Sequence, residues 1–133
     1  MSTKALIEAY YDAFNAGRTD EMLAMLHDDI EHHVNEGGIR RGKEKFAEFN
    51  QHMTDSYKEN LTDMVIFVNE AGDRAAAEFV VNGSYLKTDE GLPEAKGQTY
   101  RLPAGTFFQI KDGKIARVTT YYNLTDWTAQ VSA

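Results

Sequence analysis

The stretch FFQIKDGKIARVTTYYN, residues 107–123, predicts a β-hairpin. Apolar and aromatic runs flank the tetrapeptide Lys111-Asp112-Gly113-Lys114 on both sides. An Asp-Gly pair suits the tight turn between two antiparallel strands, because both residues tolerate positive φ angles. The C-terminal half of the chain is therefore expected to contain paired strands.

Further strands are expected upstream of this hairpin. LTDMVIFVNE, residues 61–70, turns at residues 71–73 into RAAAEFVVNGSYLK, residues 74–87. A polar arm, residues 88–97, then leads into QTYRLPAGTFFQI, residues 98–110. These runs are rich in β-branched and aromatic residues and are bounded by turn residues, which is typical of strands.

Helices are expected to precede the strands. Residues 2–17 have apolar side chains at helical spacing and end at a glycine that can adopt the left-handed stop. A second, short helix is expected to be capped by Thr19, and a third is expected to begin near Gly42. IEHHVN, residues 30–35, is expected to form a short strand between them.

Helices early in a chain and long strands late are typical of the α+β class. Gly83 and Gly105 interrupt two of the strands, and glycine is favoured at bulges and sharp bends, so we expect a sheet that curves. A curved antiparallel sheet with helices across its open side encloses a cone. The interior of that cone is the expected pocket.

Composition limits the classes of function. A chain of 133 residues without repeats or linkers is expected to be one domain, spanning 1–133. The net charge of −7 argues against nucleic acid or an anionic membrane surface as the main partner. The absence of cysteine excludes disulfides, thiolate metal sites and cysteine nucleophiles. The N-terminus has no apolar signal core, so we expect a cytoplasmic location.

HDDIEHHVNEGG, residues 27–38, concentrates three of the four histidines. Side chains alternate along a strand, so His32 and His33 should point to opposite faces. Diverging side chains do not fit a zinc site, in which the ligands converge on one ion at about 2 Å. A mixed site of His32, Glu78 and His52 stays open but matches no ligand-spacing motif.

His32 is the expected acid–base residue. It shares a face with Ile30 and Val34, so it should point inward. A neutral imidazole in an apolar pocket could take a proton α to a ketone or shuttle one in an aldol cyclisation. The alternative is a core histidine that is hydrogen-bonded to a carbonyl.

Glu78 lies in the otherwise apolar run AAAEFVV. It is expected either on the concave face of the sheet or on an outer dimer surface, and we favour the pocket. A buried carboxylate without a partner has a raised pKa, which is how a general acid arises. With Arg101 or Arg117 as its partner it would be a structural ion pair instead.

Four segments in order carry a family resemblance that spans nearly the whole chain. They are YYDAFNAG at 10–17, MLHDDIEHHVNEGG at 25–38, GKEKFAEFNQHM at 42–53 and FFQIKDGKIARVTTYYNLTDW at 107–127. Together they resemble the SnoaL-like polyketide cyclases and ketosteroid-isomerase-related proteins of the nuclear transport factor 2-like superfamily.

The resemblance implies a cone-shaped α+β barrel, a pocket between sheet and helices, and a homodimer formed through the outer sheet face. It also implies a polar acid–base group on the strand that carries His32. The chain departs from ketosteroid isomerase, which uses aspartates in its pocket. Here the strand position holds His32, and the last strand ends in Asn123 where SnoaL-like cyclases often have Asp.

These arguments give a set of expected site residues. His32 and Glu78 are the expected catalytic pair, with no metal and no cofactor. The expected ligand-binding side chains are Tyr10, Phe14, Val34, Asn35, Phe49, His52, Met53, Tyr100, Tyr121 and Asn123.

Three hypotheses about function follow. The first is a cofactor-free isomerase or cyclase that moves protons on a hydrophobic carbonyl compound, with Tyr121 and Asn123 as polar anchors. The second is a binding module of the same fold that holds a small hydrophobic ligand without turnover. The third is a structural dimer whose cavity is incidental.

Overall fold

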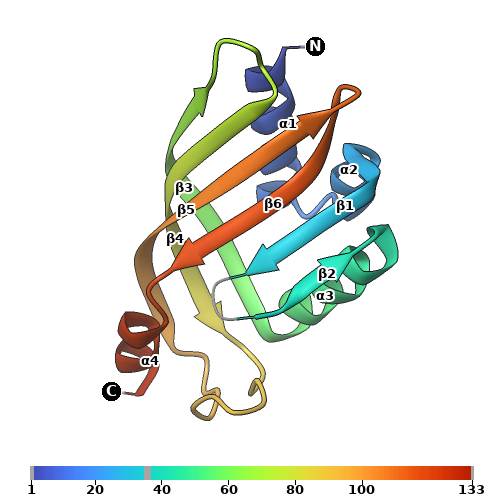
Figure 1. The fold of residues 1–133 in the computed structure, drawn as a ribbon. Helices are drawn as coiled ribbons and strands as arrows, with labels where there is room; N and C mark the ends of the chain where they lie inside the picture. The colour runs from blue at the N-terminus through green and yellow to red at the C-terminus, as the bar shows by residue number, and fades with distance from the viewer. Residues whose placement is uncertain (1, 35–36, 133) are drawn as a thin grey trace.

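Six strands form one curved sheet, and three helices lie across its concave side (Figure 1). The computed structural model describes residues 2–34 and 37–132. The elements are α1 (Thr3–Ala16), α2 (Thr19–Ala24), β1 (Leu26–Val34), β2 (Ile39–Arg41), α3 (Lys43–Ser56), β3 (Tyr57–Val68), β4 (Arg74–Tyr85), β5 (Thr99–Lys111), β6 (Lys114–Tyr122) and α4 (Leu124–Ser132). The α+β class predicted from the sequence is confirmed.

The sheet has the strand order β2-β1-β6-β5-β4-β3. Neighbouring strands are antiparallel except β1 and β6, which run parallel. The predicted hairpin is present: Lys111 pairs with Lys114, and Asp112 and Gly113 have φ angles of 54° and 72°. Two successive positive φ angles match the right-handed twist of the flanking strands.

The irregularities in strand pairing do not lie at Gly83 and Gly105, where the sequence led us to expect bends. Pairing of β4 with β5 is regular through both Gly83 and Gly105. The register shifts instead between Thr62 and Val65 in β3, where Asp63 has a φ of 56°, and between Gln109 and Ile110 in β5. Such irregularities bend a strand and increase its twist.

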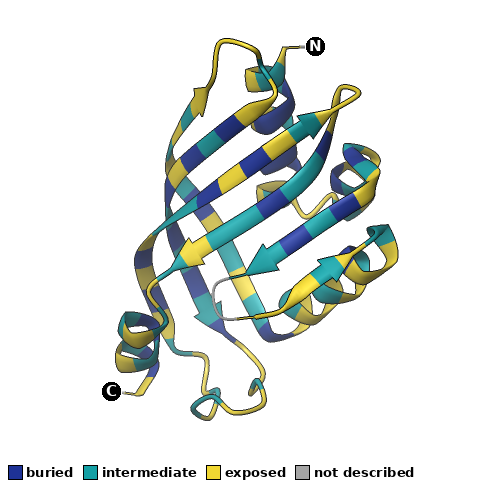
Figure 2. Ribbon diagram, in the orientation of Figure 1, coloured by how far each residue is buried: buried dark blue, intermediate teal, exposed yellow. Residues whose placement is uncertain are grey.

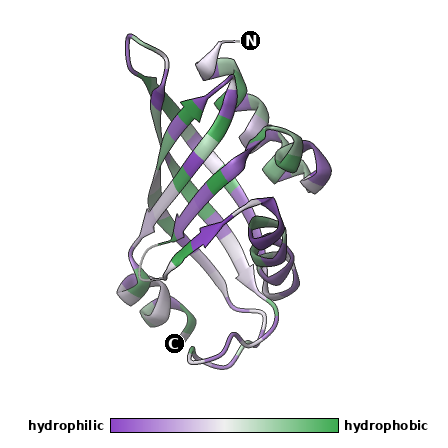
Figure 3. Cartoon of the chain, turned by 45° about the vertical axis from the view of Figure 1, so that its right-hand side comes forward, coloured by the Kyte–Doolittle hydropathy of each residue, from purple (hydrophilic) through white to green (hydrophobic). Residues whose placement is uncertain are grey.

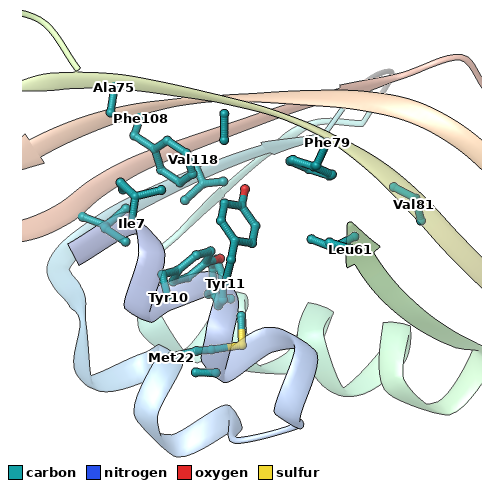
Figure 4. Close-up of a cluster of buried hydrophobic side chains, with 14 of the residues drawn as sticks. Ile7, Tyr10, Tyr11, Met22, Leu61, Ala75, Phe79, Val81, Phe108 and Val118 are labelled. Carbon is teal, nitrogen blue, oxygen red and sulfur yellow. The ribbon is translucent and has the colours of Figure 1, made fainter. Parts of the chain in front are cut away.

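Each long strand has one buried and one exposed face. Buried residues alternate with more exposed ones along β4 and β5 (Figure 2), and hydrophobic and hydrophilic residues are both present along the strands of the sheet (Figure 3). The buried face packs against α1, whose apolar side chains meet the sheet (Figure 4). The hydroxyl of Tyr11 reaches the sheet and shares a hydrogen bond of 2.7 Å with Thr106.

The helix ends follow local chemistry only in part. Ser2 caps α1 by accepting a hydrogen bond from the amide of Ala5, and Gly17 ends the helix with a φ of 74°. The expected cap at Thr19 is wrong: Thr19 is already helical and its hydroxyl accepts a hydrogen bond from Asn50. No helix within the described residues is long and apolar enough to cross a membrane.

Gly83 leaves the space that Tyr100 occupies. The two residues are paired across β4 and β5, and a Cβ added at Gly83 would overlap the Tyr100 ring. Gly83→Ala should therefore lower the free energy of unfolding by about 1–3 kcal/mol, as overpacking does. Urea unfolding measures the change.

Gly105→Ala is the matched control, because its added Cβ would meet only a backbone oxygen at 3.6 Å. It should change stability much less. Equal losses in the two variants would show that the Tyr100 ring is not what requires glycine at position 83.

Candidate functional site

His32 lies on the inner wall of the sheet, between two aromatic rings of α3. Its ring centroid is 4.8 Å from that of Phe46 and 4.8 Å from that of Phe49. The residue is only 5% exposed, and its Nδ1 atom is buried without a hydrogen-bond partner. Buried polar atoms in proteins are nearly always hydrogen-bonded, so the unpartnered Nδ1 of His32 is an exception.

The surroundings of His32 disfavour its protonation. Burial, together with the positive charge of Arg40 and the neighbouring His33, lowers the pKa of His32 to about 4. The imidazole is therefore neutral at neutral pH, with one ring nitrogen carrying a proton and the other free to accept one.

Arg40 is the cross-strand neighbour of His32. The two residues are paired between β2 and β1 and share the inner face. The guanidinium carbon of Arg40 lies 4.2 Å from the centroid of the Phe49 ring. Its Nη1 atom is buried and donates no hydrogen bond.

A second polar group lies on the inner face of β3. The hydroxyl of Tyr100 donates a hydrogen bond of 2.5 Å to the carboxylate of Glu59. Burial raises the pKa of Glu59, and the hydrogen bond from Tyr100 opposes part of that rise. Trp127 packs edge-on against Tyr100, with ring centroids 5.9 Å apart, and is buried.

Asp89, in the arm after β4, connects this region to α3. It accepts a hydrogen bond of 2.8 Å from the hydroxyl of Tyr57 and lies 3.0 Å from Nε2 of His52. Burial raises the pKa of Tyr57 well above its ordinary value, and the hydrogen bond to Asp89 raises it further. Tyr57 is therefore held as a neutral hydroxyl.

Glu78 does not face the interior. It lies exposed on the outer face of β4, while Ala77 and Phe79 on either side are buried. Strand alternation explains the placement, because the buried set of β4 falls on the odd-numbered residues. The expectation that Glu78 faces the pocket is wrong, and the alternative of an outer surface describes its position.

Tyr121 and Asn123 also lie outside the interior. Tyr121 is 53% exposed, and its ring packs edge-on against Phe107 on the outer sheet face. The side-chain oxygen of Asn123 accepts a hydrogen bond from the amide of Asp126 and so begins α4. Their expected role as polar anchors in the pocket does not fit these positions.

The remaining expected ligand-binding residues fall into three groups. Phe14, Val34, Phe49 and Met53 are half-buried, Tyr10 and Tyr100 are buried, and His52 is exposed beside Asp89. Tyr10 lies toward Met22, whereas the hydroxyl of Tyr11 points at the sheet (Figure 4). Asn35 lies outside the described residues.

The mixed metal site of His32, Glu78 and His52 is not brought together. His32 is inside the sheet, Glu78 is on its outer face, and His52 is on the surface of α3. Among residues 2–34 and 37–132, no group of three or more His, Cys, Asp and Glu side chains converges as metal ligands would.

Sequence reasoning missed Glu59 and Arg40. The strand β3 begins at Tyr57, four residues before the expected start at residue 61. Counting the alternation back from buried Leu61 would have placed Glu59 and Tyr57 inside. Arg40 lies on a strand of only three residues, which carries no periodic signal of its own.

The family comparison agrees with this fold. The sequence model of the SnoaL-like domain matches residues 7–118. No curated protein matches the chain.

Two solved structures have close similarity to the whole chain, and both are provisionally named polyketide cyclases. One, from Silicibacter sp. TM1040, is 64% identical, covers 99% of this chain and 96% of its own, and has a TM-score of 0.97. The other, from Pseudomonas putida KT2440, is 55% identical, covers 98% of each chain, and also has a TM-score of 0.97. An NTF2-like protein from Burkholderia xenovorans LB400, 15% identical with a TM-score of 0.78 and coverage of 97% and 95%, has a similar fold.

The buried position of His32 predicts a pH dependence of stability. The unfolded chain binds a proton at an ordinary histidine pKa near 6.5, whereas folded His32 binds one only near pH 4. Its contribution is therefore fully present above about pH 6.5 and is lost as the pH falls toward 4, by up to about 3 kcal/mol. Urea unfolding at pH 7 and pH 4 should show this loss in the wild type and a smaller one in His32→Gln. Parallel losses in the two proteins would contradict the assignment.

Proposed function

The chain belongs to the SnoaL-like family, and we propose that it is a cofactor-free isomerase or cyclase that moves protons on a hydrophobic carbonyl compound. The observation that supports the proposal is His32, a buried neutral imidazole with an unpartnered nitrogen set between Phe46 and Phe49. Apolar walls with a few polar groups are typical of sites for small organic ligands.

In the proposed step, the free nitrogen of His32 accepts a proton from the carbon next to the carbonyl group. The electron pair of that C–H bond moves onto the carbonyl, which becomes an enolate, and His32 becomes an imidazolium. Return of the proton to a different carbon gives the isomer. In a cyclisation, the enolate carbon attacks a second carbonyl, and the new alkoxide takes the proton from His32.

Glu59 is the proposed second group. Its raised pKa favours a protonated carboxyl group, which can donate a hydrogen bond to a carbonyl oxygen. Tyr100 holds one carboxyl oxygen and so fixes the orientation of the group. The strands that carry these two residues, β1 and β3, both contact α3.

Deuterium exchange tests the proton transfer. The protein is incubated with cyclic ketones and β-diketones in deuterated buffer, and deuterium entry next to the carbonyl is followed by NMR. Exchange should be fast in the wild type and fall at least about 100-fold in His32→Gln, the usual size of a general-base contribution. Glu59→Gln should reduce it less.

His33→Gln is the matched control, because His33 is adjacent in sequence but lies on the other face of β1. Exchange that survives in His32→Gln, or that falls equally in His33→Gln, would contradict the mechanism. Ligand binding without exchange would favour the second candidate, a binding module. The low pKa of His32 supports that candidate, because a weak base removes carbon-bound protons poorly.

We also propose that the outer face of the sheet binds a second copy of the chain. Val65, Phe67, Phe107 and Tyr121 form an apolar patch there, each about half exposed. A shallow hollow beside it is lined by His33, Phe107, Arg117, Thr119 and Tyr121. Patches of this kind mark interaction surfaces.

The charges of this outer face are complementary to each other. Arg117 Nε is buried without a hydrogen-bond partner, and Glu78 is exposed two strands away on β4. A two-fold interface repeats the same surface on both subunits, so unlike charges of one face can meet across it. The patch thus favours a homodimer over an unrelated partner.

Phe107→Glu should separate the dimer into monomers, because it places a charge in the centre of the apolar patch. Sedimentation velocity measures the state. Leu86→Glu is the control: Leu86 is 52% exposed, close to the 48% of Phe107, but lies beyond the end of β4. A wild-type monomer, or dissociation by both variants alike, would refute the interface.

The cytoplasmic location and the exclusion of nucleic acid and membranes stay predictions from the sequence.

A further inference from the structure

Arg40 places an incompletely paired positive charge on the inner wall. Its Nη1 atom is buried and has no hydrogen-bond partner. Within residues 2–34 and 37–132, no carboxylate lies within ion-pair distance of its guanidinium group. A buried donor on a charged group is costly to leave unpaired, so this arrangement requires a compensating partner.

The neighbours of Arg40 hold it in one orientation. Its guanidinium group lies against the Phe49 ring, and a Cβ added at Gly37 would lie 3.7 Å from its Nη1 atom. A guanidinium group stacked on an aromatic ring keeps its plane fixed, which prepares its N–H groups for a planar partner. The side chain is therefore held in place while its Nη1 atom has no hydrogen-bond partner.

Within the part of the chain that the structure describes, the other polar groups near Arg40 do not neutralise it. His32, its cross-strand neighbour, has an unpartnered Nδ1 atom of its own. Glu31, on the neighbouring strand, lies on the opposite face of β1, where it is 3.5 Å from Arg41. The inner face at this point thus combines a fixed cation, a free imidazole nitrogen and an aromatic ring.

We propose that Arg40, with His32 beside it, is a subsite for an ionised oxygen on an apolar ligand. The ligand class is a flat hydrophobic carbonyl compound that carries a carboxylate or an enolate-type oxygen. An oxygen anion would accept the free N–H of Arg40 while its carbon framework lies along Phe49 and Phe46. This proposal rests on the proposed function in one respect, because it places the ligand beside His32 in the interior. It adds the charge that the ligand must carry.

Matched pairs of ligands test the subsite by isothermal titration calorimetry at neutral pH. One pair is 2-hydroxy-1,4-naphthoquinone, which is ionised, and its 2-methoxy derivative, which is neutral. The other pair is 2-naphthoate and its methyl ester. The first pair tests an enolate-type oxygen and the second a carboxylate. The wild type should bind at least one ionised ligand about tenfold or more tightly than its methylated counterpart, the size of one charge-assisted hydrogen bond.

Arg40→Gln should abolish that preference and leave the affinity for the methylated ligand nearly unchanged. Arg41→Gln is the matched control, because Arg41 is adjacent but lies on the outer face, and it should keep the preference. Equal affinities within both pairs in the wild type would overturn the proposal, as would a preference that survives in Arg40→Gln.

Arg40→Lys provides a second variant if Arg40→Gln does not fold. It keeps the charge and loses the planar fork, so the preference should fall several-fold. An undiminished preference in Arg40→Lys would overturn the role given to the guanidinium group. Equilibrium binding requires no turnover, so an anion preference without deuterium exchange would refute the proposed proton transfer and leave this subsite intact.

Discussion

The curved sheet has one face that must be kept from water, and α1 and α3 cover it. Tyr11 joins α1 to the centre of that face through Thr106, and Phe46 and Phe49 bring α3 against β1. Polar groups on the covered face, such as those of His32 and Thr106, are consequently held away from water. Removal from water favours the uncharged form of an ionisable group, whichever sign its charge has.

The shifts in pKa follow this rule in both directions. Burial lowers the pKa of His32 and raises those of Glu59, Tyr57 and Tyr100. Burial therefore disfavours the charged form of His32 and of Glu59 alike. Arginine is different, because a guanidinium group stays protonated in proteins, so Arg40 brings charge to a wall where its neighbour is neutral.

The sequence predicted the parts of the site that depend on periodicity within one strand. Ile30 and the alternation around it placed His32 inside correctly, and the Asp112-Gly113 turn fixed the last hairpin. Glu78 was assigned to the wrong face because an apolar run such as AAAEFVV has no visible parity until its buried set is known. The positions of Arg40 and Glu59 depend on contacts between segments far apart in the sequence. Arg40 lies on a strand of three residues, and Glu59 accepts a hydrogen bond from Tyr100 of β5.

The low pKa of His32 is linked to the positive charge of Arg40, its cross-strand neighbour. Burial is the largest cause that opposes protonation of His32, and the charge of Arg40 is the second, so His32 is a weak base. An ionised oxygen bound to Arg40 would cancel much of that repulsion, and the same holds for the enolate that forms when His32 takes a proton. Proton transfer would then create a negative charge on the ligand and a positive charge on His32 at the same time. Both would lie beside the guanidinium group of Arg40, which Phe49 holds in place. A site of this kind gains basicity only when a ligand of the right charge is present, which reconciles a buried, weakly basic histidine with proton-transfer chemistry.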